Sequence, residues 1–533
     1  MPGTDGVPSG GGGAAAGQSG TAGDATASGD ELLLARIRRL ASAEYDASVK
    51  ALLSTAQSPA SGPDFPPDLR QDGFTVNDAQ RVDAVIIERL SDAADALATE
   101  AQTNGTLSKL APCSVSDDAT TCARTFVTTF GAKVYRRPLV DDEVSALLGL
   151  YGVGADGATY LDGIAHVTRG LLQSAGFLYL TELGPDPSAH GTVTLTSYEL
   201  ASSLSYLLTS SPPDAELLAK ATAGALANAD EREAQARRLL AQDPAAQDTV
   251  VRIVREWLGV DGILDSAKDS LAYPDFAEEK PKIVAESSDF VRAVAFQSTG
   301  NVSELLGANW TVNSGPLELY QTAGSGPVAG TTLVTDRVGI LNQAAFLATY
   351  ANAHESHPVF RGVAVARRVV CLPLDSPASF DISVVPPAPD PSLTTRERFD
   401  AHVVDPICAG CHDIIDPFGF SFEHYDGMGA YRATENGQEV DGSVVVTDQA
   451  DYDGAYADSN ALATALAASP TVHECMARNV FRASAATGDG AATPGEKEFI
   501  DFWHSLPAAA QGNIVETLIA FVKSPNFGVR NQP

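Results

Sequence analysis

The segment with the most specific chemistry covers residues 406–412 and reads Pro-Ile-Cys-Ala-Gly-Cys-His. Its residues Cys408, Cys411 and His412 form the Cys-x-x-Cys-His pattern that attaches a c-type haem. Each thiol can form a thioether with one vinyl group of the porphyrin, and the histidine can ligate the iron. A structural zinc site needs four ligands, and no second Cys-x-x-Cys pair occurs. A bare thiol or disulfide pair is the other alternative. We predict one covalent haem c with His412 as the proximal iron ligand.

The sixth ligand of the iron is left open by the sequence. A methionine thioether suits electron transfer, and Met428 and Met476 follow His412 by 16 and 64 residues. The histidine candidates are His402, His357, His424 and His473. Without a side-chain ligand, the iron would be open to small molecules and to peroxidase-like chemistry. Asp416 could accept a hydrogen bond from the His412 imidazole, but we favour a cap on the turn before Pro417.

The remaining cysteines form an even set outside the haem motif. Cys113 and Cys122 bracket a short polar loop, which predicts a local disulfide. Cys371 and Cys475 would then pair across the haem segment. The alternative is that all four are buried free thiols.

Composition excludes some classes of partner. The chain has 533 residues, 44% of them apolar, with a formal net charge of -33 and a pI of about 4.5. Nucleic-acid binding depends on Lys and Arg that neutralise phosphates, so we expect no nucleic-acid partner. No apolar stretch of about 18 residues occurs, so we expect no transmembrane segment. The negative charge favours a basic redox partner. The oligomeric state is open.

The first residues bear on cellular location. The sequence begins without a basic and apolar export signal, and residues 1–30 are nearly all small or polar. Such a tract predicts a flexible linker. Because c-type haem is attached on the far side of the cytoplasmic membrane, we expect the numbering to start inside a longer precursor. The expected location is periplasmic, on the outer surface or secreted.

The elements that must hold these residues are mostly helices. Apolar residues from Leu33 to Leu53 recur at helical spacing, which predicts a helix from residue 31. Thr196 and Glu199 form a capping box, and Asn436-Gly437 predicts a β-hairpin. We expect residues 299–335 to be loops and find no repeat of fixed period. The predicted fold is mainly α, with several helical domains, a cytochrome-c-like helical module and a small β-hairpin. The predicted domains are a linker (1–30), helical domains (31–110, 111–155 and 156–335), a haem module (336–455) and a C-terminal helical domain (456–533).

Several short motifs occur in a specific order over residues 31–530. They are Arg38-Arg39-Leu40, Tyr135-Arg136-Arg137-Pro138-Leu139, Leu171-Leu172-Gln173-Ser174 with Phe177-Leu178-Tyr179, Arg361-Gly362, Asp426-Gly427 and Ser524-Pro525-Asn526-Phe527. In this order they resemble the planctomycete and myxobacterial multidomain proteins that combine PSD modules with a PSCyt cytochrome-c-like module (DUF1587, DUF1595, DUF1592, DUF1588 and DUF1585). The resemblance implies an exported haem-binding protein that takes part in electron transfer, and supplies no substrate.

Three functions remain compatible with these residues. The first is electron transfer by a monohaem protein whose helical domains dock partners. The second is binding or modification of an extracellular polymer, or peroxidase-like catalysis, with an auxiliary haem. The third is a surface scaffold whose haem is structural. Whether the chain is an enzyme is therefore open.

Overall fold

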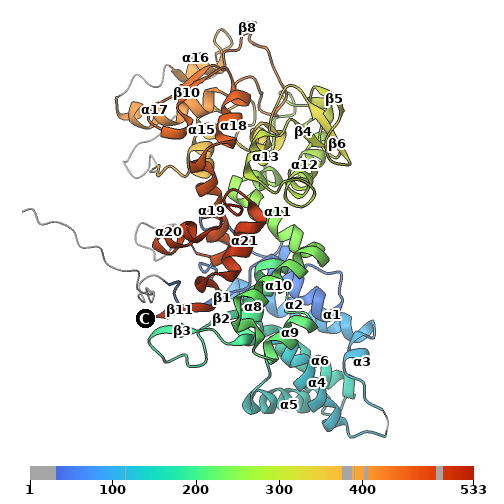
Figure 1. Cartoon of the computed structure of the whole chain (residues 1–533). Coiled ribbons are helices and arrows are strands. Elements are labelled where there is room, and N and C mark those ends of the chain that lie inside the picture. Colours follow the sequence, from blue (N-terminus) through green and yellow to red (C-terminus); the bar gives the residue numbers. More distant parts are fainter. Residues whose placement is uncertain (1–31, 115, 375–386, 389, 401–405, 488–495) are drawn as a thin grey trace, which may run out of the picture.

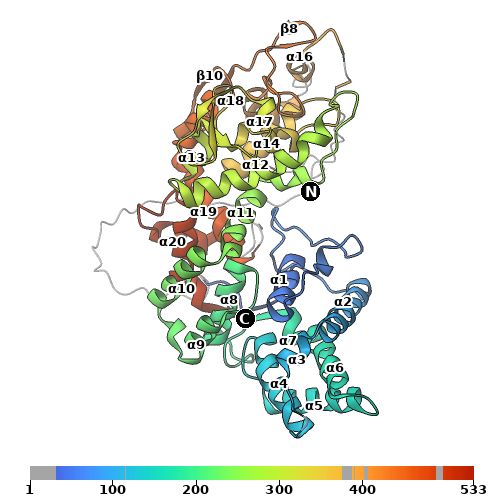
Figure 2. The same cartoon turned by 90° about the vertical axis from the view of Figure 1, so that its right-hand side faces the viewer.

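The computed structural model describes residues 32–533 except 115, 375–386, 389, 401–405 and 488–495. The predicted linker (residues 1–30) and His402 lie outside the described residues. Figures 1 and 2 show an elongated molecule with α1–α7 at one end and α12–α18 at the other. Helices α8–α11 and α19–α21 lie between these ends. The prediction of a mainly α fold is confirmed.

The N-terminal end is a bundle around one apolar core that includes residues from Tyr45 to Leu178. Its helices are α1 (Ser42–Leu53), α2 (Ala84–Thr103), α3 (Thr106–Leu110), α4 (Ala119–Val134), α5 (Asp141–Ala155), α6 (Tyr160–Gln173) and α7 (Ala175–Leu178). The Asp83 carboxylate caps α2, and Thr159 and Asp162 form a capping box at α6. The predicted Cys113–Cys122 disulfide is present and closes the loop that leads into α4. The predicted domain boundaries at residues 110 and 155 fall within this core and stay predictions.

The prediction of a helix from residue 31 is wrong for its first ten residues. Strand β1 (Arg36–Arg39) pairs antiparallel with β2 (Tyr179–Glu182), and the helix begins only at Ser42. Arg38 explains the difference, because its guanidinium is buried and donates two hydrogen bonds of 2.7 Å to Glu44. Pairing with a strand about 140 residues away overrides the local helical spacing, as tertiary contacts commonly do.

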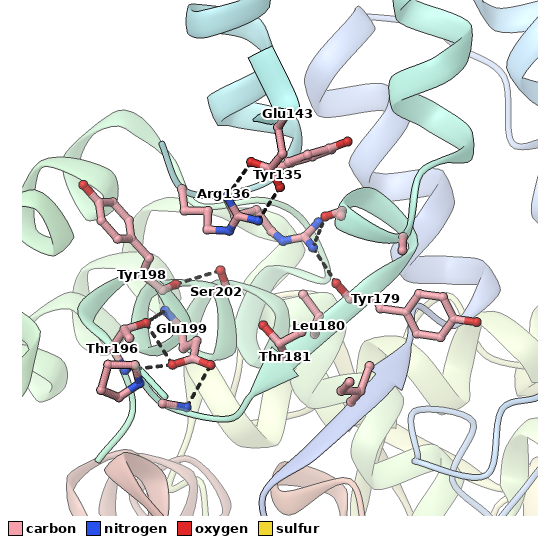
Figure 3. Close-up of a pocket in the computed structure, with 16 residues that line it drawn as sticks. Tyr135, Arg136, Glu143, Tyr179, Leu180, Thr181, Thr196, Tyr198, Glu199 and Ser202 are labelled. Atoms are coloured by element: carbon pink, nitrogen blue, oxygen red, sulfur yellow. Dashed lines mark hydrogen bonds and ion pairs between the residues drawn. The ribbon is translucent and has the colours of Figure 1, made fainter. Parts of the chain in front are cut away.

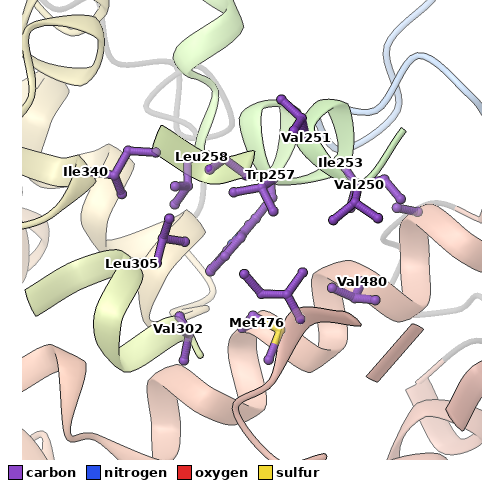
Figure 4. Close-up of a cluster of buried hydrophobic side chains, with 14 of the residues drawn as sticks. Val250, Val251, Ile253, Trp257, Leu258, Val302, Leu305, Ile340, Met476 and Val480 are labelled. Carbon is purple, nitrogen blue, oxygen red and sulfur yellow. The ribbon is translucent and has the colours of Figure 1, made fainter. Parts of the chain in front are cut away.

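The middle of the molecule shares one large apolar core with the far end. Its helices are α8 (Ser197–Thr209), α9 (Ala215–Thr222), α10 (Ala229–Gln242), α11 (Pro244–Leu258), α19 (Pro470–Ala485), α20 (Glu496–Ser505), α21 (Ile514–Lys523) and α22 (Pro525–Gly528). The predicted capping box at α8 is confirmed, with Thr196 and Glu199 in both roles. Trp257 of α11 is 1% exposed and packs beside Met476 of α19 (Figure 4).

Strands β2 and β11 each end a structural unit that occurs twice in the chain and that the sequence did not predict. Ser174 follows α6 and Ser524 follows α21 as the C-cap residue, and each serine hydroxyl donates to the carbonyl three residues earlier at 2.7 Å. A one-turn helix follows in each copy, with a buried phenylalanine (Phe177 or Phe527), and then a strand. Strand β11 (Val529–Gln532) pairs antiparallel with β3 (Gly191–Thr194). The copies lie about 350 residues apart, so no fixed period reveals them.

The far end of the molecule carries the remaining helices and small sheets. The helices are α12 (Phe276–Gln297), α13 (Val302–Gly307), α14 (Ala344–Thr349), α15 (Pro358–Ala364), α16 (Thr395–Asp400), α17 (Pro406–Phe420) and α18 (Ser459–Ala467). Residues 299–335 are not all loops as predicted. They hold α13 and an antiparallel sheet in the order β4-β6-β5 (Trp310–Val312, Thr331–Val334 and Thr322–Ser325). These strands are only three or four residues long, too short for an alternating pattern to be recognised.

The predicted hairpin at Asn436-Gly437 is confirmed. It joins β7 (Thr434–Glu435) to β8 (Gln438–Glu439), and both turn residues have positive φ, 52° and 81°. Strands β9 (Val444–Val446) and β10 (Gly454–Tyr456) form a further pair. The chain therefore has several small sheets where the sequence predicted one hairpin. Among the described residues, no helix is both long and apolar enough to cross a membrane.

Candidate haem-attachment site

Helix α17 (Pro406–Phe420) carries the Cys-x-x-Cys-His motif on its first two turns. Pro406 begins the helix, a position at which the missing N–H of proline costs nothing. The backbone places Cys408 one turn before Cys411 and His412, so the three positions share one side of the helix. The Cys411 side chain is exposed. The structure describes side chains of this helix from residue 409 onward.

The imidazole of His412 is fixed by Asp416, one turn further along α17. Nδ1 of His412 lies 2.8 Å from Oδ1 of Asp416, and the two side chains are 12% and 10% exposed. An ionised carboxylate only accepts hydrogen bonds, so Nδ1 carries the proton and the lone pair lies on Nε2. This is the tautomer that ligates iron through Nε2. Our preferred role for Asp416, a cap before Pro417, is therefore wrong: Asp416 lies inside the helix and orients the histidine.

Close packing against α15 fixes the position of α17. A Cβ atom on Gly362 of α15 would clash with the Ile415 carbonyl, and one on Gly419 would clash with the Pro358 carbonyl. Only glycine allows the two backbones to approach this closely. Arg361, also on α15, is fully buried and donates to four carbonyl groups. These belong to Leu347, Phe422, Tyr425 and Asp426. Burial lowers the pKa of Arg361 to about 10. One buried cation thus holds the turn that follows α17.

Beside α17 lies a small apolar cluster. Phe420 of α17 packs with Phe399 of α16 and Val444 of β9, separately from the main core. Arg396 of α16 lies over the Phe420 ring, 5.1 Å from its centre. Positions 412, 416 and 420 follow at four-residue spacing, so His412 and Phe420 lie toward the same side of α17. The two thiols and the imidazole of the motif, together with this apolar surface, fit the chemistry of a covalent haem. The residues of the cluster come from three elements, α16, α17 and β9.

Four family models match the chain, one after another. Residues 38–103 match PSD3 (DUF1587), residues 122–182 match PSD5 (DUF1595), and residues 195–321 match PSD4 (DUF1592). Residues 337–435, which contain α15 and α17, match PSCyt3 (DUF1588). The chain belongs to the family of multidomain proteins built from PSD and PSCyt modules. All four models are described as proteins of unknown function. No curated protein and no solved structure matches the chain. A fifth module of DUF1585 type stays a prediction.

The two methionines predicted as sixth ligands lie in different surroundings. Met428 is 6% exposed, in a turn where the Asp426 carboxylate accepts N–H bonds from three successive residues. The turn is therefore held in place by its own hydrogen bonds. Met476 is fully buried, and its labelled neighbours in Figure 4 belong to α11, α13, α19 and residue 340. Core packing explains both positions, and the choice of sixth ligand stays a prediction.

The described histidines have structural partners. His357 stacks on Phe360 at 3.7 Å, and burial lowers its pKa to about 4. His424 stacks on Tyr431, and Nε2 of His473 lies 3.1 Å from Oγ of Ser303. These contacts are typical of structural histidines. His412 differs from them because its partner is a carboxylate on the motif helix.

The second predicted disulfide joins the PSCyt3 module to the C-terminal helices. Cys371 follows the π-helical turn Val365–Val369 after α15 and is bonded to Cys475 of α19. Both predicted disulfides are thus present, and the alternative of four free thiols is wrong. Because the bond spans 104 residues that include α17, it closes the segment that carries the haem motif.

Proposed function

We propose that this chain is an exported c-type monohaem protein that transfers electrons. The observation that carries the proposal is the His412–Asp416 hydrogen bond on the helix that also bears both motif cysteines. A metal-ligating histidine commonly donates its second ring N–H to a carboxylate, which fixes both the tautomer and the ring orientation. A solvated histidine on a helix surface has no need of such a partner. The PSCyt3 match over residues 337–435 supports the same conclusion.

Each residue of the site has a distinct part in this proposal. Cys408 and Cys411 would hold the porphyrin through thioethers, and His412 would ligate the iron from the proximal side. A bound haem c supplies an iron that alternates between two oxidation states and so carries one electron. Asp416 would keep the imidazole oriented so that Nε2 is available to the iron. The apolar surface of Phe420, Phe399 and Val444 would exclude water from one side of the ring.

Export is part of the proposal because haem c is attached outside the cytoplasm. Two disulfides support it, since such bonds persist in oxidising compartments and are rare in the cytosol. The high negative charge favours a basic protein as the redox partner.

The decisive experiment is maturation of the chain in a bacterial periplasm that contains the haem c attachment machinery. We expect a Soret band, and a pyridine haemochrome assay that gives one covalent haem per chain. The Cys408→Ala/Cys411→Ala variant is expected to lose the haem on a denaturing gel, whereas the Cys113→Ala/Cys122→Ala variant keeps it. A wild-type chain without a Soret band would disprove the haem assignment. A reversible one-electron wave without peroxide turnover supports electron transfer, and peroxide turnover supports the peroxidase-like alternative.

A further inference from the structure

An open pocket of about 640 Å³ lies far from the haem motif, between the segments that match PSD5 and PSD4. Its floor is the outward face of the β1–β2 pair, where Ile37 and Thr181 are cross-strand neighbours. Its walls carry Tyr135 after α4, Tyr179 of β2 and Tyr198 of α8 (Figure 3). A volume of this size is typical of sites for small organic ligands.

The wall beside Tyr135 is held rigidly. Arg136 has a positive φ of 60° and is buried, and its guanidinium donates to the carbonyls of Gly176 and Tyr179 at 2.8 and 2.7 Å. Arg137 forms two hydrogen bonds with Glu143, at 2.9 and 2.7 Å. The pocket is therefore preformed.

The floor offers one main-chain donor and one acceptor at Thr181. The Leu40 N–H donates to the Leu178 carbonyl, and in an antiparallel pair the bonded positions alternate along the strand. Residues 180 and 182 therefore bond to β1, and the N–H and C=O of Thr181 point away from it. On that edge the Tyr179 carbonyl is occupied by Arg136, and the Leu183 N–H by Glu199 at 2.8 Å. The backbone of Thr181 lies between these two satisfied groups.

The chemistry of the lining selects a neutral ligand. The charged groups Arg136, Arg137, Glu143 and Glu199 already pair with one another or with main-chain groups. The tyrosine rings provide flat apolar surfaces with hydroxyl groups at their tips, and the hydroxyl of Tyr198 lies 3.3 Å from Oγ1 of Thr222. A sugar ring combines apolar C–H faces with hydroxyls that both donate and accept, which matches the tyrosines and the Thr181 backbone. We propose that this pocket binds a neutral carbohydrate chain. The proposal does not depend on haem.

Isothermal titration of the full chain with cellohexaose, xylohexaose, mannohexaose and chitohexaose tests the proposal. We expect binding of at least one of them. Tyr198→Ala is expected to weaken it about tenfold, the effect of losing roughly 1.4 kcal/mol of ring contact. Thr181→Trp places a large side chain at an exposed strand position inside the pocket and is expected to abolish binding. Tyr431→Ala, which removes a tyrosine that is 41% exposed in the PSCyt3 module, is the matched control and is expected to bind as wild type.

Melting curves and circular dichroism establish that each variant is folded before its affinity is compared. Absence of binding by all four hexasaccharides at millimolar concentration would overturn the proposal. So would equal affinity of the wild type and the folded Thr181→Trp variant. A proline-rich decapeptide is titrated as well. If the chain binds this peptide and none of the four sugars, the pocket is a peptide site and the proposal is overturned.

Discussion

The carboxyl group of Glu286 on α12 should make the stability of this protein depend on pH. Glu286 is fully buried and accepts hydrogen bonds from Thr311 Oγ1 at 2.5 Å and from the Tyr320 hydroxyl at 2.6 Å. Burial raises its pKa from 4.5 to about 7, although these bonds and the charge of Arg337 oppose the shift. A shift of this size corresponds to about 3 kcal/mol at 1.36 kcal/mol per pKa unit.

The sign follows from which state binds the proton more tightly. The folded state has the higher pKa, so it keeps the proton to higher pH than the unfolded chain does. The stabilisation is complete below pH 4.5, declines as the pH rises toward 7, and is lost above that. Glu286→Gln removes this titration. Between pH 4.5 and pH 8, the free energy of unfolding of wild type should therefore fall by about 3 kcal/mol relative to that of the variant.

Urea unfolding followed by tryptophan fluorescence at a series of pH values measures this difference. Glu278→Gln, an exposed position on the same helix, is the control and should run parallel to wild type. If the curves of wild type and Glu286→Gln are also parallel from pH 4.5 to pH 8, the assignment of a protonated buried carboxyl is wrong.

Three further perturbations test other parts of the structure. Removing the Cys371–Cys475 bond, which spans 104 residues, should lower the free energy of unfolding by about 4.7 kcal/mol. Removing the nine-residue Cys113–Cys122 bond should lower it by about 3 kcal/mol or less. Equal losses of stability in melting experiments would contradict the loop-entropy account. Asp416→Asn should weaken the binding of His412 to the iron about tenfold. Added imidazole should then shift the Soret band at a tenfold lower concentration, while the haemochrome yield stays unchanged. An unchanged imidazole titration would refute the orienting role. Gly419→Ala should destabilise the chain by about 1–3 kcal/mol because its Cβ meets the Pro358 carbonyl. In the control Gly410→Ala, on the same helix, the Cβ meets nothing within 4 Å, so the change should be neutral or stabilising. Equal urea midpoints of the two variants would argue against the tight α15–α17 crossing.

Local chemistry determined which features could be predicted from the sequence. The capping box at Thr196 and the Asn436-Gly437 turn each depend on a few neighbouring residues, and the structure contains both. The disulfides followed from counting, since four cysteines remain outside the haem motif.

Features that need distant partners were missed. Strand β1 exists because β2 lies beside it, and its residues alone fit a helix. The role of Asp416 was misjudged for a different reason. Position 416 is one turn after His412, but that spacing matters only if the helix continues through Pro417, which usually interrupts a helix. The pocket at β1 and β2 could not be predicted, because it combines residues from more than three elements.

The C-terminal segment explains how the two proposed sites share one molecule. At one end, Cys475 of α19 is bonded to Cys371, next to the helix pair that carries the haem motif. At the other end, β11 pairs with β3, and Arg530 joins Arg36 on the buried carboxylate of Glu182, within the β1–β2 pair that floors the pocket. Burial would raise the pKa of Glu182, but the two guanidinium groups outweigh it and hold the pKa below its usual value. Removing residues 470–533 would leave that carboxylate with one cation, β3 without a partner strand and Cys371 without its disulfide. The segment therefore connects the PSCyt3 module to the pocket. The haem and carbohydrate proposals are tested separately, but they concern two sites that this segment joins.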